Sequence, residues 1–232
     1  MKKSHFFYLA LFSIIFFTGN IQGQTKESVK EQADERMAKS NLDQEKKAEE
    51  WVASLDLNNE SKENQLRETI AIHLKIIRDW HNDHPYTTVP AGINPLDGKS
   101  LSDLDRQIIA NSAMPAIVHQ NLMKGLRKEL KKEQVETILD KYTVGKVEFT
   151  MAGYHAIVQD LTGEEEKTIR GYMEQAREQA VDYKNMNQIS GIFEIYKTKA
   201  EQYLNSNGRN WREMYKSYVK EANAKKAEGK VN

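Results

Sequence analysis

The chain has 232 residues, of which 34 are Lys or Arg and 34 are Asp or Glu, so its formal net charge at neutral pH is zero. A chain without excess positive charge has no general attraction for nucleic acid, and no basic face stands out, so we expect no nucleic-acid partner. The absence of Cys excludes disulfides, thiolate zinc sites and a cysteine nucleophile. The length suits one domain, or at most two small ones.

The N-terminus has the pattern of an export signal. Lys2 and Lys3 precede an apolar run over residues 6–17, which is shorter than the roughly 20 residues that cross a bilayer as a helix. We therefore predict a signal peptide over residues 1–24 and a periplasmic or secreted protein with no membrane association once the signal is removed. An uncleaved anchor is the alternative. Without residues 1–24 the chain keeps 32 basic and 34 acidic residues, a net charge of about −2.

The rest of the chain is dominated by stretches in which apolar residues recur every three or four positions. This period is typical of amphipathic α-helices. We predict a polar, flexible leader over residues 25–44, an all-helical domain over residues 45–218 and a Lys- and Ala-rich tail over residues 219–232. The predicted fold class is all-α, a single compact domain of six to eight helices.

Helices are expected over residues 44–55 and 61–81, followed by one long Pro-rich loop over residues 84–99. Ser102 and Asp105 then have the spacing of a helix start. The β-branched residues of 143–150 predict a turn and a short extended or non-helical link. Further helices are predicted over residues 116–132, 132–142, 163–183 and 188–204, with a last amphipathic segment around residues 211–218.

Titratable side chains are densest at the end of the second predicted helix, where Trp80 and His81 are followed by His84. Two His three residues apart can bind a metal, but no third ligand accompanies them, so we predict no metal and interpret this segment as a solvated helix end. A sugar site is a further interpretation, because the Trp80 ring lies beside a group that titrates near neutral pH. His73 is in the middle of an apolar stripe, which favours a hydrogen-bonded core histidine.

The C-terminal helices carry other candidate groups beside their apolar stripes. Arg177 and Lys197 flank the stripes of consecutive helices, where they could reach a pocket or pair with surface acids. Tyr196 is on a buried stripe and is either structural or a proton donor or base. No Gly-rich phosphate loop or nucleophile elbow is present in the sequence, so we expect no nucleotide or other cofactor.

The C-terminal half also carries a series of short motifs in a fixed order. It resembles the Bacteroidetes family catalogued as domain of unknown function 3826 over roughly residues 45–215. The residues that carry the resemblance are Leu130-Lys-Lys-Glu-Gln-Val135, Tyr142-Thr-Val-Gly145, Phe149-Thr150, Tyr154, Leu161-Thr-Gly-Glu-Glu165, Ala176-Arg-Glu178, Asp182, Phe193, Tyr196-Lys197, Lys199, Tyr203-Leu204 and Gly208, with His81 upstream. Val144 and Glu148 depart from the family pattern, as does the Pro-rich loop.

The resemblance implies an exported protein that acts with polysaccharide-degrading enzymes. The activity it implies is a dehydratase that removes water from a uronic-acid-ended oligosaccharide, such as one from the algal polysaccharide ulvan. Such an elimination needs a cation for the carboxylate, a base for the C5 proton and an acid for the leaving hydroxyl. On this reading Arg177, assisted by Lys197 and Trp80, binds the substrate, and His81 or Tyr196 is the base, with the other or Tyr154 as the acid.

Two other functions are compatible with the sequence. The first is a periplasmic, non-catalytic helical binding or chaperone-like protein, because amphipathic helices without motif-grade catalytic residues are often binding modules. The second is an accessory protein that binds an oligosaccharide and leaves it unchanged. The dehydratase requires convergent Arg, His and Tyr side chains at one cavity, whereas a chaperone requires a broad exposed face.

Overall fold

The computed structural model describes residues 26–95 and 98–228, so the predicted signal peptide lies outside the described residues. The chain divides into two compact units at residues 40 and 41. The described residues form nine α-helices and no strand, which confirms the all-α class with more helices than expected. They are α1 (Lys26–Ala53), α2 (Glu60–Asp83), the 3-10 turn η1 (Tyr86–Thr88), α3 (Asp103–Ser112), α4 (Ala116–Glu129), α5 (Lys132–Thr143), α6 (Lys146–Ile157), α7 (Gly163–Ala180), α8 (Met186–Ser206) and α9 (Trp211–Glu228).

Two segments that were expected to be irregular are helical. From Lys26 onward, the predicted leader belongs to α1, and the predicted tail continues α9 as far as Glu228. Both segments are rich in Ala, Glu and Lys, which have high intrinsic helix propensity. Propensity alone therefore explains helices that the low apolar content did not suggest.

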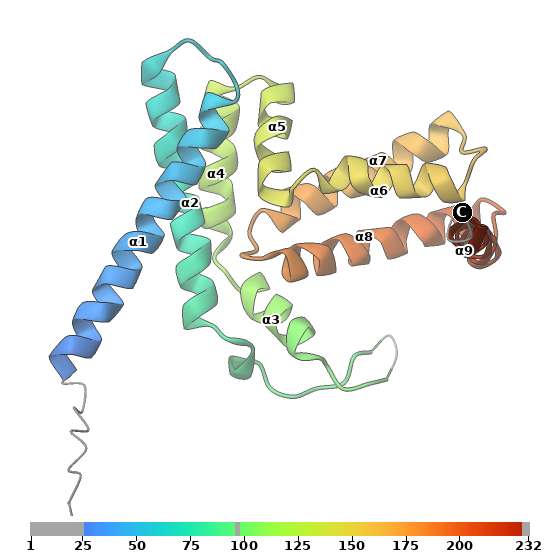
Figure 1. Ribbon diagram of the computed structural model, residues 1–232, viewed down its shortest axis with the longest axis horizontal. Helices are drawn as coiled ribbons and strands as arrows, with labels where there is room; N and C mark the ends of the chain where they lie inside the picture. The colour runs from blue at the N-terminus through green and yellow to red at the C-terminus, as the bar shows by residue number, and fades with distance from the viewer. Residues whose placement is uncertain (1–25, 96–97, 229–232) are drawn as a thin grey trace, which may run out of the picture. The chain divides into compact units, whose positions relative to one another are not determined.

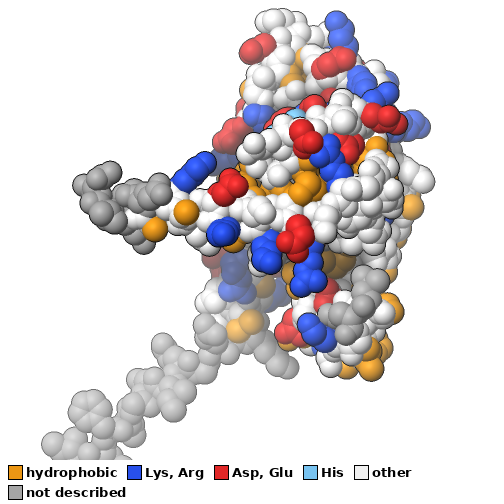
Figure 2. Space-filling model, turned by 90° about the vertical axis from the view of Figure 1, so that its right-hand side faces the viewer, with side chains coloured by type: hydrophobic (Ala, Val, Ile, Leu, Met, Phe, Trp, Pro, Cys, Tyr) orange, Lys and Arg blue, Asp and Glu red, His pale blue; other side chains and the backbone are white. Residues whose placement is uncertain are grey.

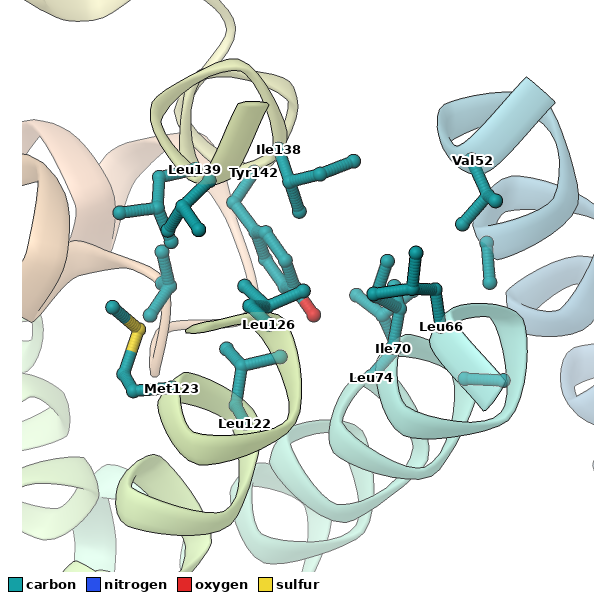
Figure 3. Close-up of a cluster of buried hydrophobic side chains, with 14 of the residues drawn as sticks. Val52, Leu66, Ile70, Leu74, Leu122, Met123, Leu126, Ile138, Leu139 and Tyr142 are labelled. Carbon is teal, nitrogen blue, oxygen red and sulfur yellow. The ribbon is translucent and has the colours of Figure 1, made fainter. Parts of the chain in front are cut away.

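The first hydrophobic core lies between α2, α4, α5 and the second half of α1. Figure 3 shows its side chains, with Val52 facing Leu66 and Ile70 of α2, and Leu126 of α4 beside Tyr142 of α5. The spacing of the α2 residues in this core, Leu66, Ile70, Leu74 and Ile77, is the stripe that predicted the helix. Each such fully buried aliphatic side chain contributes about 2 kcal/mol.

The second hydrophobic core is formed by α6, α7, α8 and α9. Helices α7 and α8 run side by side, with α6 packed against α7 (Figure 1). Ile169, Met173 and Ala176 of α7 meet Ile192 and Phe193 of α8 in this core. Helix α9 contacts α6 and α8. The helices predicted from residues 163–183 and 188–204 thus bury the faces that their periodicity indicated.

The two cores meet at the turn between α7 and α8. Val181 packs into the first core and Tyr183 into the second. Asp182 lies between these two residues and receives hydrogen bonds from His73 and His119. This turn consequently fixes the register between the two sets of helices.

Helix starts follow the predicted capping chemistry. In α7 the Thr162 hydroxyl accepts from the Glu165 backbone, and the Glu165 carboxylate accepts from the Thr162 backbone, which completes a capping box. Ser102 and Asp105 form the same arrangement at the start of α3. Both signals were read correctly because a capping box depends on residues only three positions apart.

The expectation of a turn and a non-helical link over residues 143–150 holds only at its beginning. Val144 and Gly145 are both left-handed, with φ of 55° and 63°, and α6 starts at the next residue. Val147, Met151 and Tyr154 then face the second core at helical spacing. Burial of this face overrides the weak helix propensity of the β-branched residues.

The Pro-rich segment contains η1 and an isolated antiparallel bridge between Ile93 and Ser100. Arg106 of α3 donates two hydrogen bonds to the Val89 carbonyl and so holds the segment against α3. Within residues 26–95 and 98–228, no helix is both long and apolar enough to cross a membrane.

Arg209 offers a test of the ion pairs in the second core. Its guanidinium donates to both carboxylate oxygens of Glu165 at 2.8 and 2.7 Å, and this pairing lowers the Glu165 pKa to about 2. Arg209→Met leaves the Glu165 carboxylate with its Thr162 backbone hydrogen bond but without its cation, so we expect a loss of about 2 kcal/mol in unfolding free energy at neutral pH, measured by urea denaturation. Arg212→Met, an exposed change on α9, should alter it by less than about 0.5 kcal/mol.

The pH dependence of this loss is a second readout. The folded Glu165 pKa lies below the unfolded one, so the pair stabilises the protein above about pH 4.5 and ceases to do so as the pH falls toward 2. The difference between the parent protein and Arg209→Met should therefore shrink across that range. An unchanged difference would contradict the assigned pairing.

Candidate functional site

A hydrogen-bonded network of four side chains lies where the two cores meet. Asp182 accepts from His73 Nε2 at 3.0 Å and from His119 Nδ1 at 2.9 Å. His73 Nδ1 lies 3.1 Å from the Tyr142 hydroxyl. Because a carboxylate only accepts, His73 donates from Nε2, which leaves Nδ1 to accept from Tyr142. The network thus joins α2, α4, α5 and the α7–α8 turn, and it confirms His73 as a hydrogen-bonded core histidine.

Charge in this network is shared unequally. The hydrogen bond to Asp182 raises the pKa of His119 above its ordinary value, against the opposing effect of burial, and the charge of Glu178 adds to the rise. Burial raises the pKa of Asp182, but hydrogen bonds from His119 and His73 outweigh burial and hold it below its ordinary value. Burial and the nearby Asp182 charge raise the pKa of Tyr142 well above its ordinary value. Asp182 is therefore the anion, and His119 is the member held toward the cationic form.

The network leads from the interior to the surface. Side-chain exposure rises from 2% at His73 to 19% at Asp182, 27% at His119 and 43% at Glu178. His119 Nε2 lies 3.7 Å from Glu178 Oε1, and Arg127 donates to the same oxygen at 3.1 Å. His119 thus connects Asp182 in the interior to Glu178, an acid that is accessible to solvent.

Glu178 and Arg127 line a cavity of about 580 Å³ formed by residues of α4, α5 and α7 and by Leu130. Its volume suits a small molecule or the end of a longer one. Three cations line its walls, Arg127, Lys132 and Arg177, and three acids lie among them, Glu136, Glu174 and Glu178. The cavity therefore combines anion-binding groups with carboxylates that can accept a proton.

Arg177 is the predicted carboxylate-binding residue, and it lines this cavity. Only 6% of the residue is exposed, and its Nη1 donates to Asp140 at 2.9 Å. Its Nε is buried and has no hydrogen-bond partner among the described residues. A buried donor without a partner is unfavourable by about 1–3 kcal/mol, so the Nε of this cavity-lining residue is the unsatisfied polar group of the site.

Two other predicted residues, Tyr154 and Lys197, line a different cavity of about 640 Å³ formed by residues of α6, α8 and α9. The Tyr154 hydroxyl donates to the Lys197 carbonyl at 3.3 Å, and burial raises the pKa of this phenol. Lys197 Nζ contacts both oxygens of Glu194, at 2.8 and 2.9 Å. Tyr154 is therefore a hydrogen-bond donor rather than a base.

The remaining predicted residues have structural partners. His81 Nδ1 lies 3.0 Å from Gln188 Nε2, and burial together with Lys184 lowers the His81 pKa. Trp80 stacks on His84 with ring centroids 3.7 Å apart and donates to the Ala110 carbonyl.

Tyr196 donates to Gln179 at 3.0 Å, and Lys199 lies over its ring. Of His81, Arg177 and Tyr196, only Arg177 lines the 580 Å³ cavity, so the expected convergence of the three on that cavity is not found.

His119 and Asp182, which were not among the predicted site residues, each connect two other side chains through hydrogen bonds or ion pairs. His119 is four residues before Met123 and eight before Arg127, so the three share one face of α4. Asp182 is an acid between two apolar residues, Val181 and Tyr183, in a tight link between two strongly predicted helices. Such a flanked acid is a detectable signal for a buried, partnered carboxylate. Among the described residues, no group of three or more His, Asp or Glu is arranged to hold a metal ion.

Fold and site together define an all-α protein in which a buried His–Asp–His network adjoins a cavity lined by Arg and Glu. The chain belongs to the family described as Protein of unknown function (DUF3826), whose sequence profile matches residues 41–224. The match begins at the first residue of the second compact unit. The chain matches no curated protein.

The raised pKa of His119 can be measured by following its imidazole resonances in an NMR titration. Asp182→Asn removes the carboxylate that favours the cation, so we expect the His119 pKa to fall. Because the folded pKa is raised, this interaction stabilises the protein below pH 6.5 and is lost as the pH rises through the folded pKa. The loss of stability in the variant should accordingly be larger below pH 6.5, as long as the pH stays above about 3.8 so that Asp182 is ionised in the parent protein.

Glu178→Gln provides a second variant that leaves the buried network intact. It should also lower the His119 pKa, whereas Glu164→Gln, at an exposed position of the same helix, should not. A His119 pKa that is the same in the parent protein, Asp182→Asn and Glu178→Gln would show that the carboxylates do not act on this imidazole.

Proposed function

We propose that the protein is an exported carbohydrate-active dehydratase that removes water from the uronic acid at the non-reducing end of an oligosaccharide, as in ulvan degradation. The observation that carries the proposal is Arg177, a nearly buried residue that lines a cavity together with Glu178 and whose Nε has no hydrogen-bond partner among the described residues. Membership of the family supports the resemblance from which this reaction was first inferred. The N-terminal pattern of residues 1–24 supports export.

The substrate carboxylate would be bound by Arg177 Nε, with Arg127 as a second donor. A guanidinium offers several N–H groups in one plane and matches a carboxylate better than an ammonium does. Neutralising the carboxylate makes the adjacent C5–H more acidic, because the charge that develops on removal of the proton spreads onto the carboxylate oxygens. This is the role that the family resemblance implied for Arg177.

The proton steps are reassigned from His81 and Tyr196 to Glu178 and His119. Glu178 takes the C5 proton, and the electron pair of the C5–H bond forms the C4–C5 double bond. The C4–O bond breaks, and the leaving oxygen takes a proton from His119 and departs as water. The Asp182 hydrogen bond raises the His119 pKa and so favours its protonated form, and the separation of 3.7 Å between His119 Nε2 and Glu178 provides a route for returning the proton afterwards.

Asp182 and His73 are positioning residues in this scheme. Asp182 holds the His119 ring through Nδ1, which directs Nε2 toward Glu178. His73 and Tyr142 fix Asp182 from the interior. The arrangement of an acid that orients a histidine is a general way to set its tautomer and charge.

The reaction can be tested by incubating the purified protein with a uronate-ended ulvan oligosaccharide. The expected product has lost the mass of one water and absorbs in the ultraviolet as a 4,5-unsaturated uronate. Glu178→Gln and His119→Gln should each lower kcat by about 10²-fold or more, because each removes a proton-transfer group. Arg177→Lys, which keeps the charge beside Asp140, should lower kcat/KM by about tenfold.

A matched His–Glu contact elsewhere in the chain provides the control. His155 Nε2 lies 3.5 Å from Glu166 Oε1, outside the cavity, so His155→Gln and Glu166→Gln should retain parent activity. Arg170→Gln on α7 is the matched control for Arg177. If the oligosaccharide binds but its mass does not change, the protein is a non-catalytic binding protein and not a dehydratase. Full activity in Glu178→Gln would remove this residue from the mechanism.

A further inference from the structure

The 640 Å³ cavity formed by residues of α6, α8 and α9 has a composition unlike that of the Arg177 cavity, and the two share no lining residue. Six aromatic side chains line it: Phe149, Tyr154, Phe193, Trp211, Tyr215 and Tyr218. Figure 2 shows the face that includes α9, on which hydrophobic side chains lie among Lys, Arg, Asp and Glu side chains. This combination of apolar rings and charges requires a ligand that satisfies both.

Several of these rings are exposed in a way that packing does not explain. Phe149 is 77% exposed and Tyr215 is 50% exposed, although large apolar side chains at helical positions usually pack inward. Trp211 and Tyr215 are one turn apart on α9, with their ring planes inclined by only 25°. Their ring centroids are 6.1 Å apart, so the two rings form one stacked, nearly parallel pair at this wall of the cavity.

Space between the rings comes from small residues of α6. Ala152, Gly153 and Ala156 line the cavity, and a Cβ added at Gly153 would meet nothing within 4 Å. Helix α6 is therefore hollowed on the side that faces the cavity. A ring-sized ligand can enter without displacing a side chain of this helix.

Charged groups of both signs accompany the rings. Lys146 and Lys197 are balanced by Glu194 and Glu201, so the cavity has no excess charge. Lys197 is held by Glu194, and burial raises the pKa of Glu201 above its ordinary value. Lys146 Nζ lies 5.6 Å from the centroid of the Phe193 ring, so a cation of the protein already lies over that ring.

We infer that this cavity binds a neutral pyranose ring of an oligosaccharide, stacked on Phe149 and the Trp211–Tyr215 pair and hydrogen-bonded by Lys197, Glu194 and Glu201. A sugar ring has an apolar C–H face for the aromatic rings and hydroxyl groups that both donate and accept. An acyl chain would bury the charged groups without partners. For an organic cation, repulsion by the two lysines would offset attraction by the two glutamates, so the cavity offers its charge no net attraction.

The inference rests on the proposed function only for the identity of the oligosaccharide. If the Arg177 cavity acts on a terminal uronate, a second site for a neutral sugar increases affinity for a long substrate through effective concentration. Binding at the aromatic cavity itself does not require catalysis. The two proposals can consequently fail independently.

Binding can be measured by titration calorimetry of Glu178→Gln with a uronate-ended ulvan tetrasaccharide, so that the sugar stays intact. Phe149→Ala and Tyr215→Ala, introduced separately in this background, should each raise Kd about fivefold, the effect of losing one stacking partner. Both side chains are exposed, so neither change disturbs the core. Ile195→Ala, at a similarly exposed position of α8 outside the cavity, should leave Kd unchanged.

A Kd that is unaffected by both aromatic substitutions overturns the inference, as does tighter binding of laurate than of the sugar. Binding that depends on Phe149 and Tyr215 while the parent protein leaves the oligosaccharide mass unchanged supports this cavity and overturns the dehydratase. Dehydration by the parent protein together with a Kd that Phe149→Ala and Tyr215→Ala leave unchanged supports the dehydratase and overturns the cavity. Each outcome therefore separates the two proposals.

Discussion

The arrangement of the described helices depends on how the Asp182 carboxylate is hydrogen-bonded. It lies in the link between α7 and α8, receives one hydrogen bond from each of two histidines, and has a neighbour in each hydrophobic core. A buried carboxylate is unfavourable unless it is paired and hydrogen-bonded. The two histidines meet that requirement. Because they lie on α2 and α4, their hydrogen bonds to this one carboxylate also fix how α2 and α4 meet α7 and α8.

The same requirement creates the candidate site. His119 can hold Asp182 only if its ring points toward the α7–α8 link, and this orientation brings Nε2 near Glu178. Arg177 is adjacent in sequence to Glu178, but it is buried against Asp140 of α5. Protein partners therefore hold charged groups of the cavity between α4, α5 and α7 in place, as in a preorganised site. Stability and proposed chemistry share the same residues.

Helices α6 and α9, at the second core, leave aromatic side chains exposed to solvent. Helix α6 buries Val147, Met151 and Tyr154 yet leaves Phe149 in solvent, and α9 exposes Tyr215 and Tyr218. Ion pairs at the edge of this core, such as Arg209–Glu165, stabilise it. Aromatic surface is thus retained where packing does not require it, and this is the reason to assign binding rather than stability to the second cavity.

Sequence by itself determined the helical class, the position of most helices and their starts at Ser102 and Thr162, because periodicity and capping depend on residues within two turns. It also indicated that His73 is a core residue and that Arg177 has a position from which it can reach a pocket. Only the tertiary structure decided which groups meet: Asp182 and His119 are 63 residues apart, and His81 and Tyr196 bond to glutamines on other helices. Helical spacing predicts on which face of its helix a side chain lies. The residues that pack against that face belong to segments distant in the sequence, so only the tertiary structure decides which they are.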